Sequence, residues 1–177
     1  MIDTDKMIVS LIHQNKDKRY YNWGEYIKEV ERLAQLISKS GEKFNYIIAV
    51  SRGGMFVGDI VSRALGIKYG IVKVSSYDDQ TNCQDKTQLK NIKAIIDGKL
   101  CNGKVLVIDD LVDSGSTLNV VCKYLNTKYM CEVKTAVLWE RVSETTLHQS
   151  DFCCNRIDQA NWKWIVQPNE LYQDLLI

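Results

Sequence analysis

The stretch VLVIDDLVDSGSTL, residues 105–118, joins a short apolar run to three acidic residues and then to a cluster of hydroxyl side chains. Its first four residues predict a buried strand, and Ser116 to Leu125 a helix. Asp109 and Asp110 therefore stand where a strand ends, and Asp113 follows three residues later. Because like charges repel, three acids in one turn call for an explanation such as a bound ligand.

Strands and helices alternate on both sides of this stretch. Strands are predicted at Tyr46–Val50, Ile71–Val74 and Val133–Trp139, and helices at Asn22–Ser40 and Met55–Leu65. The first helix begins with a capping-box pattern, and a glycine follows each of the two helices. This alternation predicts an α/β fold, with a parallel twisted sheet and helices on both faces. A length of 177 residues favours a single domain over 1–177.

The composition excludes several classes of protein. The chain is 45% hydrophobic and 25% charged, with a net charge of +1, so no broad surface for nucleic acid or anionic membranes is expected. No apolar run approaches the roughly 18 residues of a membrane span. The N-terminal stretch has acids near its start and no long apolar core, so it is a poor signal peptide, and the six cysteines show no metal-ligand spacing. These features favour a cytoplasmic protein with free thiols.

The hydroxyl cluster after the acids is typical of an anion site. Ser114, Gly115, Ser116 and Thr117 lead into the predicted helix, whose first N–H groups and hydroxyls suit a phosphate. Vicinal sugar hydroxyls could donate to the carboxylates, and a divalent metal could neutralise the remaining charge. Each aspartate taken alone is more often a helix cap or a solvated turn. Their combination in one turn favours a sugar-phosphate site.

Four motifs together resemble a known family. IDDLVDSGST, residues 108–117, resembles the phosphoribosyl-pyrophosphate motif of type I phosphoribosyltransferases. Residues 47–66, IIAVSRGGMFVGDIVSRALG, resemble the pyrophosphate loop and helix of the xanthine-guanine and hypoxanthine enzymes. SSYDD, residues 75–79, resembles the start of their flexible lid, and WIVQP, residues 164–168, their purine-covering hood. The resemblance extends from about Trp23 to Glu170. It implies the type I fold with a small C-terminal hood at about 140–177. Residues 1–20 form an N-terminal extension that precedes the region of resemblance.

The resemblance also implies roles for individual residues. Asp113 would accept a proton near purine N7, and Asp110 would contact magnesium. The residues implied to bind phosphoribosyl pyrophosphate are Arg52, Gly53, Ser76, Tyr77, Lys86, Asp109, Asp110, Leu111, Val112, Asp113, Ser114, Gly115, Ser116 and Thr117. Those implied to bind the purine are Asp113, Arg141, Trp164 and Ile165.

The chain departs from the family pattern at the base site. Family members carry a Lys-Pro pair after the fourth strand, whereas this chain has LWERVS, so Arg141 takes the place of the lysine and Val142 that of the proline. Arginine and lysine differ in geometry, which leaves the identity of the base open. Glu140 could also bind Arg141 and turn it away. About three extra residues precede the hood, and Lys86 is the nearest cation in a lid without arginine.

The function implied by the resemblance is purine salvage. The chain would transfer phosphoribosyl from phosphoribosyl pyrophosphate to guanine, xanthine or hypoxanthine, with Mg²⁺, as a homodimer or homotetramer without nucleic-acid or membrane partners. An alternative is a non-catalytic regulator of this fold that senses phosphoribosyl pyrophosphate or a nucleotide, but such a protein needs a basic surface or an added domain. A receiver domain also places acids after a strand, but after its first strand, and it has no use for SGST.

Overall fold

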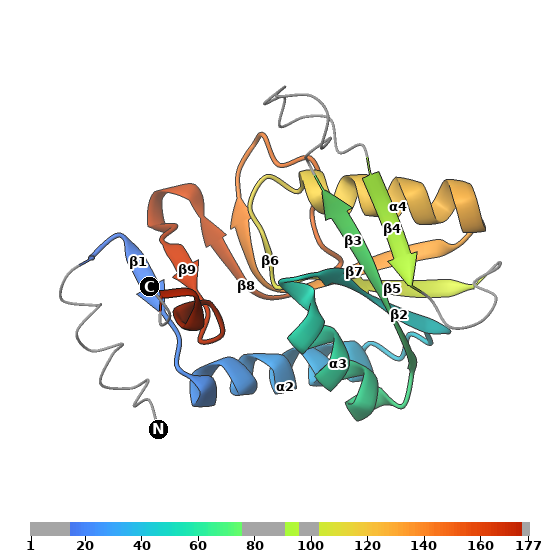
Figure 1. Ribbon diagram of the computed structural model, residues 1–177, viewed down its shortest axis with the longest axis horizontal. Helices are drawn as coiled ribbons and strands as arrows, with labels where there is room; N and C mark the ends of the chain where they lie inside the picture. The colour runs from blue at the N-terminus through green and yellow to red at the C-terminus, as the bar shows by residue number, and fades with distance from the viewer. Residues whose placement is uncertain (1–14, 76–90, 96–102, 175–177) are drawn as a thin grey trace.

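The computed structural model describes residues 15–75, 91–95 and 103–174, which form one main sheet with helices on both faces (Figure 1). Its strands are β2 (Tyr46–Ser51), β3 (Lys68–Ser75), β4 (Asn91–Ile95), β5 (Lys104–Ile108), β6 (Leu111–Val112), β7 (Glu132–Val142) and β8 (Phe152–Asp158). In space β4, β3, β2, β5 and β7 are neighbours in that order, and β8 lies on the other edge of β7. Every pairing is parallel except that of β3 with β4.

Two apolar cores lie on opposite faces of this sheet. Helices α2 (Trp23–Lys39) and α3 (Gly54–Leu65) cover one face, and α4 (Ser116–Tyr129) covers the other (Figure 1). Ile47 and Leu106 belong to the core beneath α2 and α3, whereas their neighbours Ile48 and Val107 belong to the core beneath α4. Successive residues of a strand point to opposite faces, so two apolar residues in a row fill both cores. The predicted α/β fold is confirmed.

Local signals in the sequence set the bounds of α2. Asn22 Oδ1 accepts a hydrogen bond from Glu25 N at 2.8 Å, and Glu25 Oε2 accepts one from Asn22 N at 3.1 Å, which completes the predicted capping box. The helix ends before Ser40, and Gly41 follows with φ of 74°. The predicted strands and helices are confirmed, although β7 continues to Val142, three residues beyond its predicted end.

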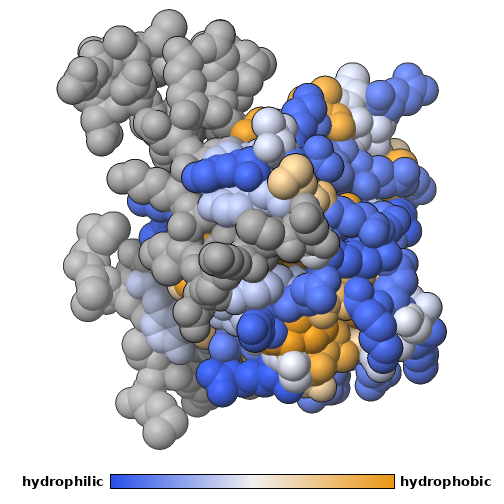
Figure 2. All heavy atoms as spheres, turned by 90° about the vertical axis from the view of Figure 1, so that its right-hand side faces the viewer, coloured by the Kyte–Doolittle hydropathy of each residue, from blue (hydrophilic) through white to orange (hydrophobic). Residues whose placement is uncertain are grey.

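The surface in Figure 2 is mainly hydrophilic, with hydrophobic side chains in limited areas between the polar ones. The larger apolar side chains of the two cores are inside, as expected for a folded domain of this composition. No helix in the described ranges combines the length and apolar character needed to cross a bilayer.

A second, two-stranded sheet lies apart from the main one. β1 (Lys18–Tyr20) pairs in parallel with β9 (Trp164–Val166), and the short helices η1 (Gln159–Asn161) and η2 (Glu170–Asp174) flank β9. The predicted hood at about 140–177 therefore belongs to two sheets, because β8 is part of the main sheet and β9 of the small one. The predicted extension at 1–20 supplies the partner strand of β9, a pairing that the sequence did not indicate.

Candidate active site

The main sheet opens between β2 and β5 at the carboxyl ends of both strands. From β2 the chain continues to β3 on one side, and from β5 to β7 on the other, so the strand order reverses between them. The pairing of β5 with β2 ends at Ile108, but its pairing with β7 continues through Asp109 and Asp110 into β6. Asp109 N donates to Ala136 O at 3.1 Å, and Leu138 N donates to Asp110 O at 2.9 Å. Ligands bind in such crevices of open α/β sheets.

The acidic pair occupies this opening. Asp109 Oδ1 accepts from Asp110 N at 3.0 Å, and Asp110 Oδ1 accepts from Leu111 N at 2.8 Å. Asp109 is only 8% exposed, and its burial, together with the neighbouring charge of Asp110, raises its pKa well above the usual value. Two like charges are therefore accommodated partly because the environment favours the neutral form of Asp109.

The turn after β2 lies directly against these carboxylates. A side chain at Gly53 would overlap the carboxylate of Asp110, and one at Gly54 would overlap the carbonyl of Ile108. The two glycines are therefore required for the close approach of this turn to the acidic pair. Arg52, whose peptide bond with Ser51 is cis, is brought to the same opening.

The predicted phosphate loop leads into α4 as expected. Gly115 adopts φ of 75° at the N-terminus of the helix, where no side chain caps the first turn. Ser114 Oγ and Ser116 Oγ lie 3.0 Å apart, and Ser116 N donates to Ser114 Oγ at 3.4 Å. An uncapped helix N-terminus beside two hydroxyls is suited to an anion such as a phosphate.

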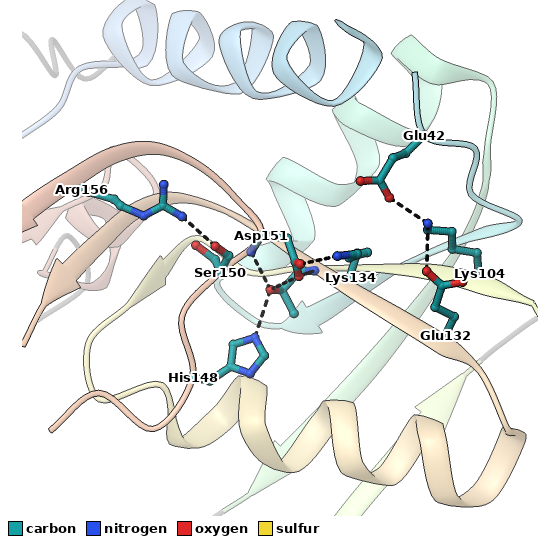
Figure 3. A network of polar contacts seen from close by, with 9 residues as sticks. Glu42, Lys104, Glu132, Lys134, His148, Ser150, Asp151 and Arg156 are labelled. Atoms are coloured by element: carbon teal, nitrogen blue, oxygen red, sulfur yellow. Dashed lines mark hydrogen bonds and ion pairs between the residues drawn. The ribbon is translucent and has the colours of Figure 1, made fainter. Parts of the chain in front are cut away.

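The connection between β7 and β8, residues 143–151, packs against the back of the phosphate loop. Leu147 N donates to Ser114 O at 2.8 Å, and a side chain at Gly115 would collide with the backbone of His148. Figure 3 shows the polar network that anchors this connection. His148 Nε2 lies 3.0 Å from Thr135 Oγ1, and Asp151 accepts hydrogen bonds from Thr135 N and Lys134 Nζ, both at 2.8 Å. The contacts of His148 are therefore structural.

Two cavities meet at the acidic pair. The larger, of about 680 Å³, is lined on one side by Arg52 and Gly53 and on the other by Gln167, Asn169, Glu170 and Tyr172. The smaller, of about 280 Å³, lies along residues 109–118 and is bordered by Trp164. Both contain the residues Asp109, Asp110, Thr117 and Glu170. Together the cavities offer an extended site, with a phosphate loop at one end and a basic turn at the other.

Arg141 forms an ion pair with Asp113, a residue that lines the smaller cavity. Arg141 Nε lies 2.6 Å from Asp113 Oδ1, in an ion pair that is not aligned as a hydrogen bond. The two side chains are 26% and 43% exposed, although the two atoms that face each other are buried. Arg141 was expected just past the fourth strand, but it lies within β7, which carries its side chain to the end of the phosphate loop.

The alternative in which Glu140 turns Arg141 away is wrong. The side chain of Glu140 is 1% exposed and contacts Ser150 Oγ, and its Oε2 accepts from Ser150 N at 3.4 Å. Arg156 Nε lies 3.5 Å from the same oxygen. Consecutive strand residues point to opposite sides, so Glu140 is occupied on one side and leaves Arg141 to Asp113 on the other.

The structure places most of the predicted site residues around the two cavities. Arg52, Gly53, Trp164 and the whole run 109–117 line them. Trp164 is 52% exposed, whereas Ile165 is 1% exposed and lines neither cavity. Ser76, Tyr77, Lys86 and the rest of the predicted lid lie outside the described residues.

Several cavity residues were missed by the sequence analysis. Gln167 and Glu170 line the cavity from the segment after β9, and Phe56 lines it from α3. Gln167 was visible within the WIVQP motif, but nothing in its spacing indicated that it reaches Asp110. Burial raises the pKa of Glu170, against the hydrogen bond from Gln167 N, and the charge of Asp110 raises it further.

The donor set is compatible with magnesium. Within the described ranges, no three His, Cys, Asp or Glu side chains converge closely enough to hold a metal by themselves. Mg²⁺ is usually held by one or two carboxylates together with substrate phosphates and water. The pair Asp109 and Asp110, in a cavity large enough for a phosphorylated ligand, fits this mode of binding.

Comparisons with known proteins agree with this geometry. The family model described as "Phosphoribosyl transferase domain" matches residues 17–174. A xanthine-guanine phosphoribosyltransferase of Idiomarina loihiensis is 38% identical over 107 residues, which are 60% of this chain and 63% of that protein, less than two thirds of its length.

Solved structures show the same architecture. The purine phosphoribosyltransferase from Pyrococcus horikoshii superposes with a TM-score of 0.66 and 28% identity over 86% of this chain and 93% of its own. The Helicobacter pylori xanthine-guanine-hypoxanthine phosphoribosyltransferase superposes with a TM-score of 0.70 over 90% and 97% of the two chains. At 23% identity, the latter likeness concerns the fold alone.

Proposed function

Since the chain belongs to the phosphoribosyl transferase domain family, we propose that it is an enzyme that transfers phosphoribosyl from phosphoribosyl pyrophosphate to a 6-oxopurine. The products are a nucleoside 5′-monophosphate and pyrophosphate. The identity to the Idiomarina xanthine-guanine enzyme supports a purine as acceptor, although it covers only 60% of this chain.

The observation that carries the proposal is the pair formed by Arg141 and Asp113. It presents a donor and an acceptor side by side, 2.6 Å apart, beside the phosphate loop. A 6-oxopurine presents an O6 acceptor next to N7, so O6 would accept from Arg141 while an N7 proton passes to Asp113. Adenine has a 6-amino donor in place of O6, which would face the guanidinium without a partner. Trp164, half exposed at the border of the same cavity, would stack on the ring.

The remaining site residues would contact the other parts of phosphoribosyl pyrophosphate. Residues 114–117 would bind the 5′-phosphate at the start of α4, and Asp109 and Asp110 would accept hydrogen bonds from the ribose hydroxyls. Arg52 would contact the pyrophosphate leaving group and offset its developing charge. Bound Mg²⁺ would supply further neutralisation of the pyrophosphate.

The test is nucleotide formation by the purified protein with phosphoribosyl pyrophosphate and Mg²⁺. Guanine, xanthine, hypoxanthine and adenine are supplied in turn, and monophosphate and pyrophosphate are both measured. Turnover with at least one 6-oxopurine, at an efficiency at least tenfold above that with adenine, supports the proposal. Tight binding of phosphoribosyl pyrophosphate without turnover of any base would instead identify a sensor of this fold.

A further inference from the structure

Gln167 is the one polar residue of the WIVQP motif, and the reaction outlined above gives it no task. It follows β9 directly and is only 1% exposed. Its amide Nε2 is in close contact with Asp110 Oδ2, whereas its Oε1 is buried without a hydrogen-bond partner. Buried side-chain amides usually have hydrogen-bond partners at both ends. Because this amide has a partner only at Nε2, its contact with Asp110 calls for an explanation.

Both oxygens of Asp110 are held. Oδ1 accepts from Leu111 N at 2.8 Å and Oδ2 faces the Gln167 amide, while Gly53 leaves room for the carboxylate on a further side. Gln167 thus supplies a neutral donor to an acid that already adjoins Asp109.

Backbone hydrogen bonds in the hood fix the position of Gln167. Gln167 N donates to Glu170 Oε2 at 3.0 Å, and Glu170 N donates to Gln167 O at 3.1 Å, which closes a tight turn. Just before this turn, Tyr21 N donates to Val166 O at 3.0 Å. The amide is therefore carried by the small sheet, whereas the carboxylate that it contacts belongs to the main sheet.

We infer that Gln167 is a positioning residue for the sugar site: its amide orients Asp110 toward the ribose hydroxyls and ties the hood to the phosphoribosyl-pyrophosphate pocket. This inference rests on the proposed function and deepens it. Glutamine meets both requirements because it donates a hydrogen bond and carries no charge. The titratable groups around this contact are Asp109, Asp110, Glu170 and the hydroxyl of Tyr26, which reaches toward them from α2.

The decisive variant is Gln167→Glu, which keeps the size and shape of the side chain. When protonated, the new carboxyl can donate to Asp110 as the amide does; when ionised, it faces Asp110 with a like charge. We expect its catalytic efficiency for phosphoribosyl pyrophosphate to be within about threefold of wild type near pH 5. By pH 8 the ratio to wild type should fall to roughly one tenth or less, as for loss of a hydrogen bond to a charged group.

Two further variants separate this role from others. Gln167→Met keeps the packing but cannot donate, so its loss of roughly tenfold or more should not change with pH. Gln159→Glu makes the same chemical change at an exposed position of η1 and should follow wild type at every pH. Calorimetric affinities for phosphoribosyl pyrophosphate with Mg²⁺ should show the same pattern as the rates.

A Gln167→Glu variant that follows wild type at every pH would overturn the inference and leave the proposed function intact. A deficit of equal size at pH 5 and pH 8 would also overturn it, in favour of a packing role. If wild type turned over no base, the proposed function would fail, and the pH dependence of the affinity would still decide the role of Gln167.

Discussion

The two halves of the candidate site are built in different ways. The phosphate half, residues 109–117, is one continuous segment that follows β5, includes β6 and ends in the first turn of α4. The base half consists of Arg141 and Trp164, which come from β7 and β9, while Gln167, in the turn after β9, contacts Asp110 of the phosphate half. Asp113 belongs to the first half and is paired with the second. A contiguous half can bind its ligand group through backbone geometry, whereas an assembled half depends on side chains that the fold must bring together.

The largest effect is expected at Asp113, where the halves meet. Asp113→Asn removes the proton acceptor, and loss of a general base typically lowers turnover by about 10²–10⁴-fold. Affinity for the nucleoside monophosphate, measured by calorimetry, should change far less, because the 5′-phosphate is bound by residues 114–117. A drop in turnover of less than about threefold would remove Asp113 from the role of base.

Arg141→Met tests the base half alone. Losing a hydrogen bond to a charged group costs about 1.5–3 kcal/mol, or roughly 10–150-fold in catalytic efficiency with a 6-oxopurine. Affinity for phosphoribosyl pyrophosphate should hardly change, since the Arg141 side chain is paired with Asp113 and lines neither cavity. Arg141→Lys should recover part of the loss, because lysine can also donate to O6. An unchanged Met variant would mean that the purine is recognised without this side chain.

Gly115→Ala tests the phosphate half alone. Gly115 and Gly41 share a positive φ, of 75° and 74°, but only at Gly115 would a methyl group collide with a neighbour, the backbone of His148. Gly41→Ala should therefore cost only about 1–2 kcal/mol of stability from backbone conformation. Gly115→Ala should cost more and lower affinity for the 5′-monophosphate by roughly tenfold. Equal behaviour of the two variants in thermal melts and calorimetry would show that the phosphate loop tolerates displacement.

The smallest effect, on stability, is expected at Asp109. Its raised pKa means that the folded protein binds this proton more tightly than the unfolded chain does. The contribution of Asp109 to the free energy of unfolding is therefore fully present below the ordinary value of 3.8 and is lost as the pH rises through the raised pKa. Asp109→Asn removes this loss, so the ligand-free variant should melt higher at neutral pH, by about 2–4 °C per kcal/mol regained. Its affinity for phosphoribosyl pyrophosphate should nevertheless fall.

Asp151 provides the matched control for this stability measurement. Burial opposes its ionisation, but hydrogen bonds from Lys134 and Thr135 outweigh burial and lower its pKa. Its contribution to stability is present above the ordinary pKa and is lost as the pH falls through the lowered one. Asp151→Asn should therefore lower the melting temperature at neutral pH, opposite in sign to Asp109→Asn. The same sign for both would contradict the assignment of burial as the dominant cause at Asp109.

The sequence predicted the parts of the molecule whose signals are local. The capping box of α2, the apolar strands β2 and β5 and the run 109–117 are each determined within a few neighbouring residues. Strands β1, β4, β6, β8 and β9 were not predicted. β6 has only two residues, and β8 alternates buried and exposed positions only irregularly, so pairing with β7 rather than local preference makes them strands.

The same distinction holds within the site. Arg141 was predicted at the base because LWERVS stands where the family carries its Lys-Pro pair, but its pairing with Asp113 depends on the length of β7. The contact of Gln167 with Asp110 joins residues far apart in sequence and on separate sheets. No local pattern indicates such a contact, since it depends on how the small sheet packs against the main sheet.

The pairing of β1 with β9 bears on how the molecule is made. These strands are separated by more than 100 residues, so they can hydrogen-bond only after β9 itself has been synthesised. A nascent chain that stops before β9 already contains every strand of the main sheet and all of residues 109–117. It lacks Trp164 and Gln167, and contacts of such long sequence separation form late. During biogenesis the growing chain therefore contains Asp113 and Arg141 before the residues proposed to stack on the base and to orient Asp110 have been synthesised.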